Sequence, residues 1–174
     1  MLKILVTPPV TAEHKQLLET AGGPEAEFIY KNADEVDAAL MQEVDILFGN
    51  VAPALVAEAK KLRLLQLFSA GTDGYIPALP EGCALTNTTG AFGLAISEHM
   101  LGMLLMLQKR LHQYRDNQNK HVWQDMGNVT SIEGATVVVL GLGDIGGEFA
   151  RKVKALGAYT IGVRRTDANK PEYI

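Results

Sequence analysis

The sequence predicts an α/β fold built on parallel strands, and three observations lead to this prediction. In residues 1–90, short apolar strands alternate with helical segments, a pattern typical of a parallel sheet with helices on both faces. Residues 136–165 then give a strand, a glycine-rich turn, a helix and a second strand. Between these regions, residues 93–117 have the spacing of one long helix. The 174 residues suffice for one ordinary domain or two small lobes.

The first region divides into strands and helices at clear signals. The expected strands are 3–7, 27–30, 44–48, 64–68 and 84–86, and the expected helices are 11–21, 33–42 and 53–61. Thr11 suits the N-cap of the first helix, with Leu17 and Leu18 facing inward.

The fourth strand leads into a loop of small residues, Ser69-Ala70-Gly71-Thr72-Asp73-Gly74. Ligands of parallel sheets bind at the carboxyl ends of the strands, and this loop lies at such an end. Its small side chains leave backbone N–H groups open to an anion. An ordinary tight connection explains the loop equally well.

The long helix is apolar almost all round from Ile96 to Leu107, so we expect it to be buried on several sides. Two interpretations are open. The helix could serve only as core, or it could link two lobes and also pack against a second subunit.

The glycine-rich turn carries the most specific signal. The apolar strand Thr136–Leu140 runs directly into Gly141-Leu142-Gly143-Asp144-Ile145-Gly146, and a helix with Phe149, Val153 and Leu156 on one face follows. In the dinucleotide-binding pattern the first glycine permits the tight turn, the second lets the backbone approach a pyrophosphate, and the third lets helix and strand pack closely. The helix N-terminus then faces the anion. The alternative is a structural strand-turn-helix without a ligand.

The second strand of this unit ends in Arg164-Arg165-Thr166. Folds that prefer NAD place an acidic residue about 20 residues along to hold the ribose, whereas Asp167 comes three residues after the usual place. Two guanidiniums beside a hydroxyl suit a 2′-phosphate, so the sequence favours NADP(H) over NAD(H). A solvated basic surface is the alternative.

Composition narrows the function classes. Hydrophobic residues make up 47% and charged residues 21%, as in globular proteins, and the net charge of −4 argues against a nucleic-acid surface. Cys83 is the only cysteine and the four histidines lack metal-ligand spacing, so no metal site is expected. Neither a signal peptide nor a membrane span is evident, and we expect a cytoplasmic protein.

Three segments together resemble the family of D-isomer-specific 2-hydroxyacid dehydrogenases. They are Ser69-Ala70-Gly71-Thr72-Asp73; Thr86-Asn87-Thr88-Thr89-Gly90 followed by Ser97-Glu98-His99; and the glycine motif with Ala150 and Leu156-Gly157. Their order and spacing resemble the family along essentially the whole chain. Thr89 stands where proline is common, and Arg164 stands where NAD-dependent members carry Asp.

The resemblance implies a flavodoxin-like parallel-sheet substrate lobe in 1–93, a connecting or interface helix in 94–119, and the first part of a Rossmann dinucleotide-binding domain in 120–174. It implies that backbone at Ala70 and Gly71 binds the substrate carboxylate, and that the segment from Asn87 through the start of the long helix lies near the cleft between the domains. It also implies that Gly141, Gly143, Asp144, Ile145 and Gly146 hold the cofactor pyrophosphate. Arg164, Arg165 and Thr166 complete the expected cofactor site.

The family's catalytic Arg, Glu and His come from a second half that nothing in this chain matches, so we expect a truncated form without its own catalytic residues. His99, beside Glu98 on the apolar helix, is expected to be structural rather than catalytic. The implied parent enzyme transfers hydride between NAD(P)H and a small 2-oxo acid, and we expect a homodimer. Alternatives are a non-catalytic nucleotide-binding or assembly module, or a two-lobe relative such as alanine dehydrogenase or adenosylhomocysteine hydrolase.

Overall fold

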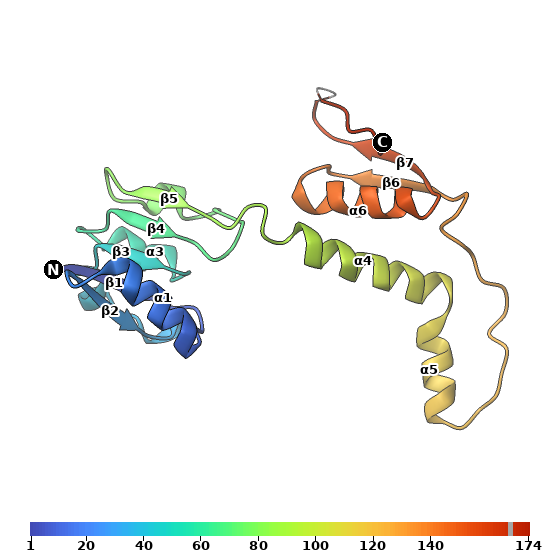
Figure 1. Cartoon of the computed structure of the whole chain (residues 1–174), viewed down its shortest axis with the longest axis horizontal. Helices are drawn as coiled ribbons and strands as arrows, with labels where there is room; N and C mark the ends of the chain where they lie inside the picture. The colour runs from blue at the N-terminus through green and yellow to red at the C-terminus, as the bar shows by residue number, and fades with distance from the viewer. Residues whose placement is uncertain (167–168) are drawn as a thin grey trace. The chain divides into compact units, whose positions relative to one another are not determined.

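The structure is a computed structural model that describes residues 1–166 and 169–174. It divides into two compact units, residues 1–89 and residues 90–174 (Figure 1). Each unit has its own hydrophobic core and is described separately below. The division into 1–93, 94–119 and 120–174 stays a prediction.

The first unit is a five-stranded parallel sheet in the order β2-β1-β3-β4-β5. Its strands are β1 (Leu2–Val6), β2 (Ala26–Tyr30), β3 (Ile46–Phe48), β4 (Leu64–Gln66) and β5 (Ala84–Thr86). Its helices are α1 (Ala12–Gly22), α2 (Ala38–Met41) and α3 (Pro53–Ala57), with short 3-10 turns η1 (Ala33–Glu35) and η2 (Ile76–Ala78). This strand order is the flavodoxin-like one, so the predicted fold class is confirmed.

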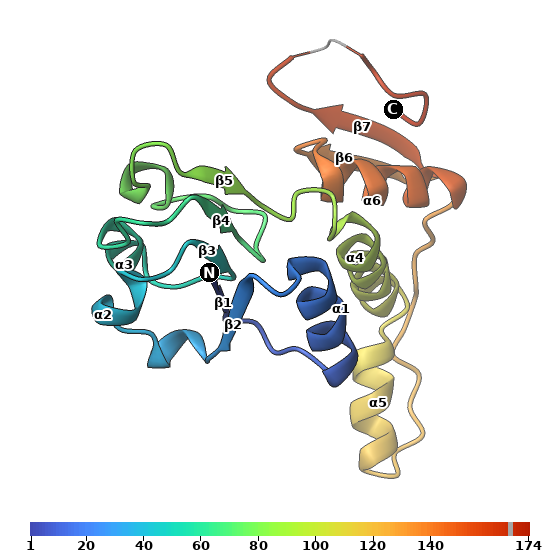
Figure 2. The same ribbon diagram turned by 60° about the vertical axis from the view of Figure 1, so that its left-hand side comes forward.

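One face of this sheet carries a row of paired leucines, namely Leu5, Leu47, Leu65 and Leu85. Paired residues of neighbouring strands point to the same side, so the row is continuous across four strands. Met41 of α2 and Val56 of α3 belong to the same buried cluster. Figure 2 shows α2 and α3 on one side of the sheet and α1 on the other.

Helix α1 begins as expected but packs less than expected. Thr11 is its N-cap, and the Thr11 side chain accepts a hydrogen bond of 3.2 Å from the backbone N–H of His14. No residue of α1 is buried, and Leu17 is 62% exposed, so the expectation that Leu17 faces inward is wrong. The physical reason is that α1 lies over β2, an edge strand whose residues are themselves only half-buried.

The helix expected over 33–42 is instead the 3-10 turn η1 and the short helix α2. Asp37 separates them, because its extended backbone and its carboxylate, 2.8 Å from the Leu40 backbone nitrogen, make it a new N-cap. Helix α3 ends at Ala57, earlier than the expected end at residue 61.

The second unit contains α4 (Gly93–Gln108), α5 (Leu111–Asn119), β6 (Thr136–Leu140), α6 (Asp144–Ala155) and β7 (Tyr159–Val163). The single helix expected over 93–117 is wrong, since the chain breaks between α4 and α5 at Arg110, whose φ is +55°. The Arg110 guanidinium donates hydrogen bonds to the backbone oxygens of Met126 (2.6 Å) and Asn128 (3.2 Å), which favours this turn.

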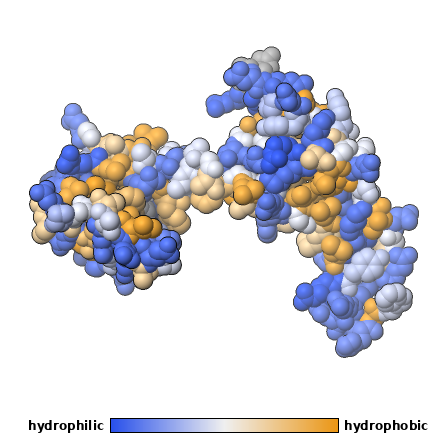
Figure 3. Space-filling model, viewed as in Figure 1, coloured by the Kyte–Doolittle hydropathy of each residue, from blue (hydrophilic) through white to orange (hydrophobic). Residues whose placement is uncertain are grey.

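Helix α4 packs one face against α6. Its inward residues Met100, Leu101, Leu104 and Leu105 meet a core that includes Phe149, Ala150 and Val153 of α6. Within this chain α6 covers only one face of α4, so burial of α4 on several sides stays a prediction. The exposed apolar residues of α4 are Leu94, Ile96, Met103 and Leu107. Figure 3 shows hydrophobic side chains gathered over this part of the second unit.

Strands β6 and β7 pair in parallel, with Leu140 opposite Val163, and α6 packs against both. Helix α6 begins at Asp144 and ends at Ala155, so Leu156 lies beyond it and is exposed rather than on its inner face. Among the residues that the structure describes, none of the helices combines the length and apolar character needed to cross a bilayer.

Candidate functional site

The turn between β6 and α6 is built by its glycines. Gly141 has φ +92°, a left-handed conformation that favours glycine, and its N–H donates to the Val163 oxygen at 2.8 Å. A Cβ on Gly146 would lie 1.9 Å from the Gly141 backbone oxygen. Strand and helix thus approach so closely here that only glycine fits at position 146.

The other side of the turn is open. A Cβ on Gly141 or Gly143 would meet no atom within 4 Å. Gly143 is the N-cap of α6 and provides no side-chain cap for the helix. The N–H groups of Asp144, Ile145 and Gly146, in the first helical turn, are therefore placed to bind an anion at a helix N-terminus.

The end of β7 lies beside this turn because Leu140 and Val163 pair. A groove of about 910 Å³ is lined by two segments, Leu140–Gly143 and Val163–Thr166. Arg164 is half-buried, while Arg165 and Thr166 are exposed. The structure thus brings together the glycine turn and the basic residues predicted to accompany it. Asp167, the late carboxylate of the sequence pattern, lies outside the described residues.

The side chain of Asp144 lies on the α4 side of the turn. Asp144 directly follows Gly143 but, like Ile145 and Gly146, it does not line the groove. Its carboxylate lies instead against Gly93, the first residue of α4.

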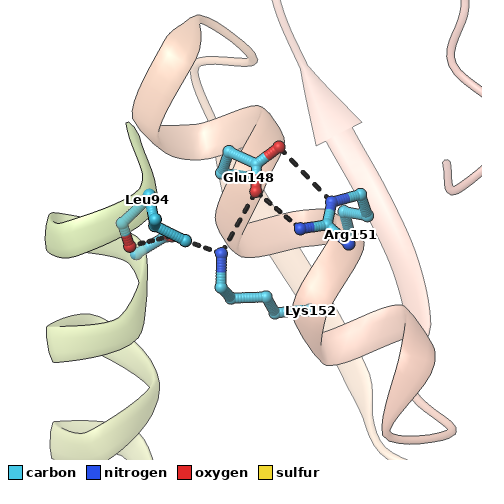
Figure 4. A network of polar contacts seen from close by, with 5 residues as sticks. Leu94, Glu148, Arg151 and Lys152 are labelled. Atoms are coloured by element: carbon cyan, nitrogen blue, oxygen red, sulfur yellow. Dashed lines mark hydrogen bonds and ion pairs between the residues drawn. The ribbon is translucent and has the colours of Figure 1, made fainter. Parts of the chain in front are cut away.

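A polar cluster ties α6 to α4 (Figure 4). The Lys152 ammonium donates to Glu148 Oε2 at 3.1 Å and to Ser97 Oγ of α4 at 2.9 Å. Arg151 donates to both oxygens of Glu148, at 3.3 and 2.8 Å. These hydrogen bonds from Arg151 and Lys152 lower the pKa of Glu148 to about 2. The cluster holds the helix that carries the anion-binding turn.

The loop Ser69–Gly74 in the first unit is the second candidate site. Ala70 and Gly71 are exposed, and their backbone N–H groups donate no hydrogen bond within the described chain. The Ala70 oxygen accepts from Asn87 Nδ2 at 2.8 Å, which fixes the loop while the N–H groups stay available. Such free N–H groups can bind a carboxylate.

Sequence reasoning missed Asn50. It follows β3, and its side chain donates to Ser69 Oγ (2.8 Å) and accepts from the Phe68 N–H (3.0 Å). Its signal was present, because Asn50 and Asn87 each follow a strand that neighbours β4, and parallel strands end at the same edge.

Tyr75 anchors the far end of the loop. It is buried, and its hydroxyl donates to the Val51 oxygen at 2.9 Å. Burial raises the pKa of Tyr75 above its ordinary value, so the phenol remains a donor at neutral pH.

His99 and Glu98 lie on α4 in the second unit, and both side chains are exposed. His99 is therefore not the buried structural histidine that the sequence suggested, and it does not line the groove at the glycine turn.

Comparison with known proteins agrees with these features. Residues 101–173 match the sequence model of the NAD-binding domain of D-isomer-specific 2-hydroxyacid dehydrogenases. A D-3-phosphoglycerate dehydrogenase from Methanocaldococcus jannaschii is 27% identical over 170 residues, which are 93% of this chain and 32% of that protein.

Two solved structures are also similar. A D-isomer-specific 2-hydroxyacid dehydrogenase family protein from Aeromonas salmonicida is 31% identical with a TM-score of 0.78, covering 94% of this chain and 54% of that one. An NAD-dependent formate dehydrogenase from Staphylococcus aureus, in complex with NAD, shares the fold at 16% identity and a TM-score of 0.79, covering 99% of this chain and 59% of that one. The chain thus spans about a third of the first relative and somewhat over half of these solved structures.

Proposed function

The chain belongs to the family of D-isomer-specific 2-hydroxyacid dehydrogenases, and from this premise we propose that its second unit binds a nicotinamide dinucleotide at the turn Gly141–Gly146. The observation that carries the proposal is the turn itself. Position 146 requires glycine, because a Cβ there would lie 1.9 Å from the Gly141 backbone oxygen. Gly141 and Gly143 instead face open space beside a helix N-terminus that has no side-chain cap. This is the cradle that a pyrophosphate needs, since backbone N–H groups and the helix dipole favour its charge.

The protein of which this chain forms a part is, on this proposal, an oxidoreductase for small 2-oxo and 2-hydroxy acids. The nicotinamide supplies the hydride chemistry when it is bound. The first unit contributes the substrate site: the N–H groups of Ala70 and Gly71 bind the acid's carboxylate, while Asn50 and Asn87 hold the loop. Binding both oxygens of a carboxylate through fixed donors orients the neighbouring carbonyl carbon for reaction.

NADP(H) is the proposed cofactor, with NAD(H) as the weaker ligand. Arg164, Arg165 and Thr166 line the groove next to the glycine turn and offer cationic and hydroxyl donors. The 2′-phosphate would receive charge-assisted hydrogen bonds there, whereas none of these three side chains offers a carboxylate to accept from the ribose hydroxyls.

The test is to titrate NADPH and NADH into the protein before and after Arg164→Asp. A hydrogen bond to a charged group contributes about 1.5–3 kcal/mol, so the NADPH preference should fall by about one to two orders of magnitude. Arg63→Asp, the same charge change at an exposed arginine of the first unit, is the control. A wild type that prefers NADH, or an Arg164→Asp variant with an unchanged ratio, would refute the assignment to NADP.

We also propose that the protein is a homodimer that acts in the cytoplasm. Support for the dimer comes from the exposed apolar face of α4, which α6 leaves uncovered. The cytoplasmic location is supported by the single cysteine, Cys83, which is unpaired.

A further inference from the structure

The first residues of α4 and α6 meet at an unusually close contact. Gly93 begins α4 and is buried, and Asp144 begins α6. A Cβ on Gly93 would lie 2.4 Å from Asp144 Oδ1, 2.8 Å from its Cγ and 3.1 Å from its backbone oxygen. Distances below 3.0 Å are not tolerated, so any side chain at position 93 must displace Asp144.

A special backbone conformation is not the reason that position 93 is a glycine. The φ of Gly93 is not positive, and Gly93 is the first residue of a regular helix. Alanine is intrinsically better than glycine in a helix by about 1 kcal/mol. Glycine at position 93 therefore matters because it leaves space for the Asp144 side chain, which alanine would take away.

The charge of Asp144 matters because of its place in the chain. Its neighbour Gly143 lines the groove of the glycine turn, but Asp144 does not. A carboxylate turned into that groove would repel the phosphates of a dinucleotide and oppose the favourable dipole of α6. In the structure it lies on the α4 side, in the space above Gly93.

We propose that Gly93 is a positioning residue for the nucleotide site, because it keeps the Asp144 carboxylate on the α4 side and out of the phosphate cradle. The inference rests on the proposed dinucleotide binding. With a methyl group at position 93, the Asp144 carboxylate must leave the space that it occupies, and on this proposal its negative charge then moves toward the phosphate cradle. Gly93 thereby sets the affinity for the dinucleotide without touching it.

The experiment measures the Kd for NADPH at low and high salt in five proteins: the wild type, Gly93→Ala, Asp144→Asn, the double variant Gly93→Ala/Asp144→Asn, and Gly102→Ala. Gly102 is the matched control, because it lies in the same helix and a Cβ there would meet nothing within 4 Å. We expect Gly93→Ala to weaken NADPH binding about tenfold at low salt and less at high salt, where charge repulsion is screened. Gly102→Ala should bind as the wild type does.

The double variant separates charge from shape. Asparagine has the size of aspartate without its charge, so Gly93→Ala/Asp144→Asn should bind within about twofold of Asp144→Asn alone. An unchanged Kd in Gly93→Ala, or an equal loss in the Asp144→Asn background, would overturn the inference. A wild type that binds neither NADPH nor NADH would instead refute the proposed function, and this inference with it.

A second pair of variants covers the case in which Gly93→Ala does not fold, as a melting curve would reveal. Asp144→Glu lengthens the side chain by one methylene and so shifts its carboxylate from the position above Gly93, and Asp144→Gln is its neutral match. We expect weaker NADPH binding in Asp144→Glu than in Asp144→Gln. Equal affinities would overturn the inference.

Discussion

Two glycines of the β6–α6 turn have different surroundings, and substitution should separate their roles. Gly146 lies against the backbone of Gly141, so Gly146→Ala must push the helix away from the strand. Overpacking of this kind costs about 1–3 kcal/mol, and the clash with backbone puts this variant at the upper end. Thermal unfolding should show a lowered melting temperature, and Gly102→Ala is the control without a clash. A Gly146→Ala variant as stable as the wild type would contradict the close packing.

Gly143→Ala should have the opposite profile. The φ of Gly143 is −78°, which alanine adopts freely, and no atom of the protein lies near the added methyl group. Stability should therefore change by less than about 1 kcal/mol. NADPH binding should weaken about tenfold or more, because the methyl group occupies the space where the pyrophosphate approaches the backbone. Calorimetric titration beside a melting curve measures both, and unweakened binding would show that the anion does not use this side of the turn.

At the residue scale, the sequence predicted what a local pattern can encode. The roles of Gly141 and Gly146 follow from a motif within six residues, and the structure gives each the predicted surroundings. Asn50 and Gly93 escaped because their partners are distant in sequence: Asn50 bonds Ser69, and Gly93 meets Asp144. Gly93 carries no local signature, and the only signal at Asn50 is its place after a strand that neighbours β4.

The boundaries of helices and strands show the same difference between features set by local sequence and features set by distant contacts. Apolar periodicity correctly located α4 and α6, but it ran two helices together across Arg110. The break there is held by hydrogen bonds to Met126 and Asn128, more than a dozen residues away. The apolar surface of α4 was equally ambiguous, because periodicity reports which residues avoid water and not which partner covers them.

The stability of the second unit should depend on pH through Glu148, whose partners Arg151 and Lys152 lie on the same helix, α6. Its folded pKa is about 2 and its ordinary value 4.5, so its ionised form stabilises the fold at pH values above about 4.5. That contribution is lost as the pH falls from 4.5 toward 2, where the carboxylate is protonated and its bonds to Arg151 and Lys152 weaken.

The measurement compares melting temperatures of the wild type and Glu148→Gln across this range. The wild type should be the more stable protein near neutral pH, and the difference should vanish toward about pH 2. Glu58→Gln, on an exposed glutamate of the first unit, controls for the loss of a surface charge. A difference that is constant with pH would mean that the charge of Glu148 does not stabilise the fold.

At the scale of the whole molecule, the alternation of strands and helices predicted the parallel sheet of the first unit, and the leucine row explains why that pattern is reliable. Every strand of a sheet covered on both faces must be apolar, so the composition of each strand carries the signal. The sequence holds no comparable signal for a surface of another molecule that packs against this chain. Four large apolar residues of α4 are exposed, namely Leu94, Ile96, Met103 and Leu107, and the sequence alone does not say what lies against them.

The proposed dimer gives a prediction about that surface. Leu107 of α4 is 58% exposed, and the protein's only tryptophan, Trp123, is fully exposed in the single chain. If a second copy packs on this face, sedimentation at micromolar concentration should show a dimer, and Leu107→Lys should shift it toward monomer by placing a charge in an apolar contact.

Leu17→Lys is the matched control, because Leu17 is 62% exposed on α1 in the first unit and should not affect assembly. Trp123 lies in the segment after α5, so its fluorescence tests whether the interface extends there: burial would shift its emission to shorter wavelength, and dilution should reverse the shift. A folded wild type that sediments only as a monomer, or a Leu107→Lys variant that assembles as the wild type does, would show that α4 is not the surface through which copies of this chain associate.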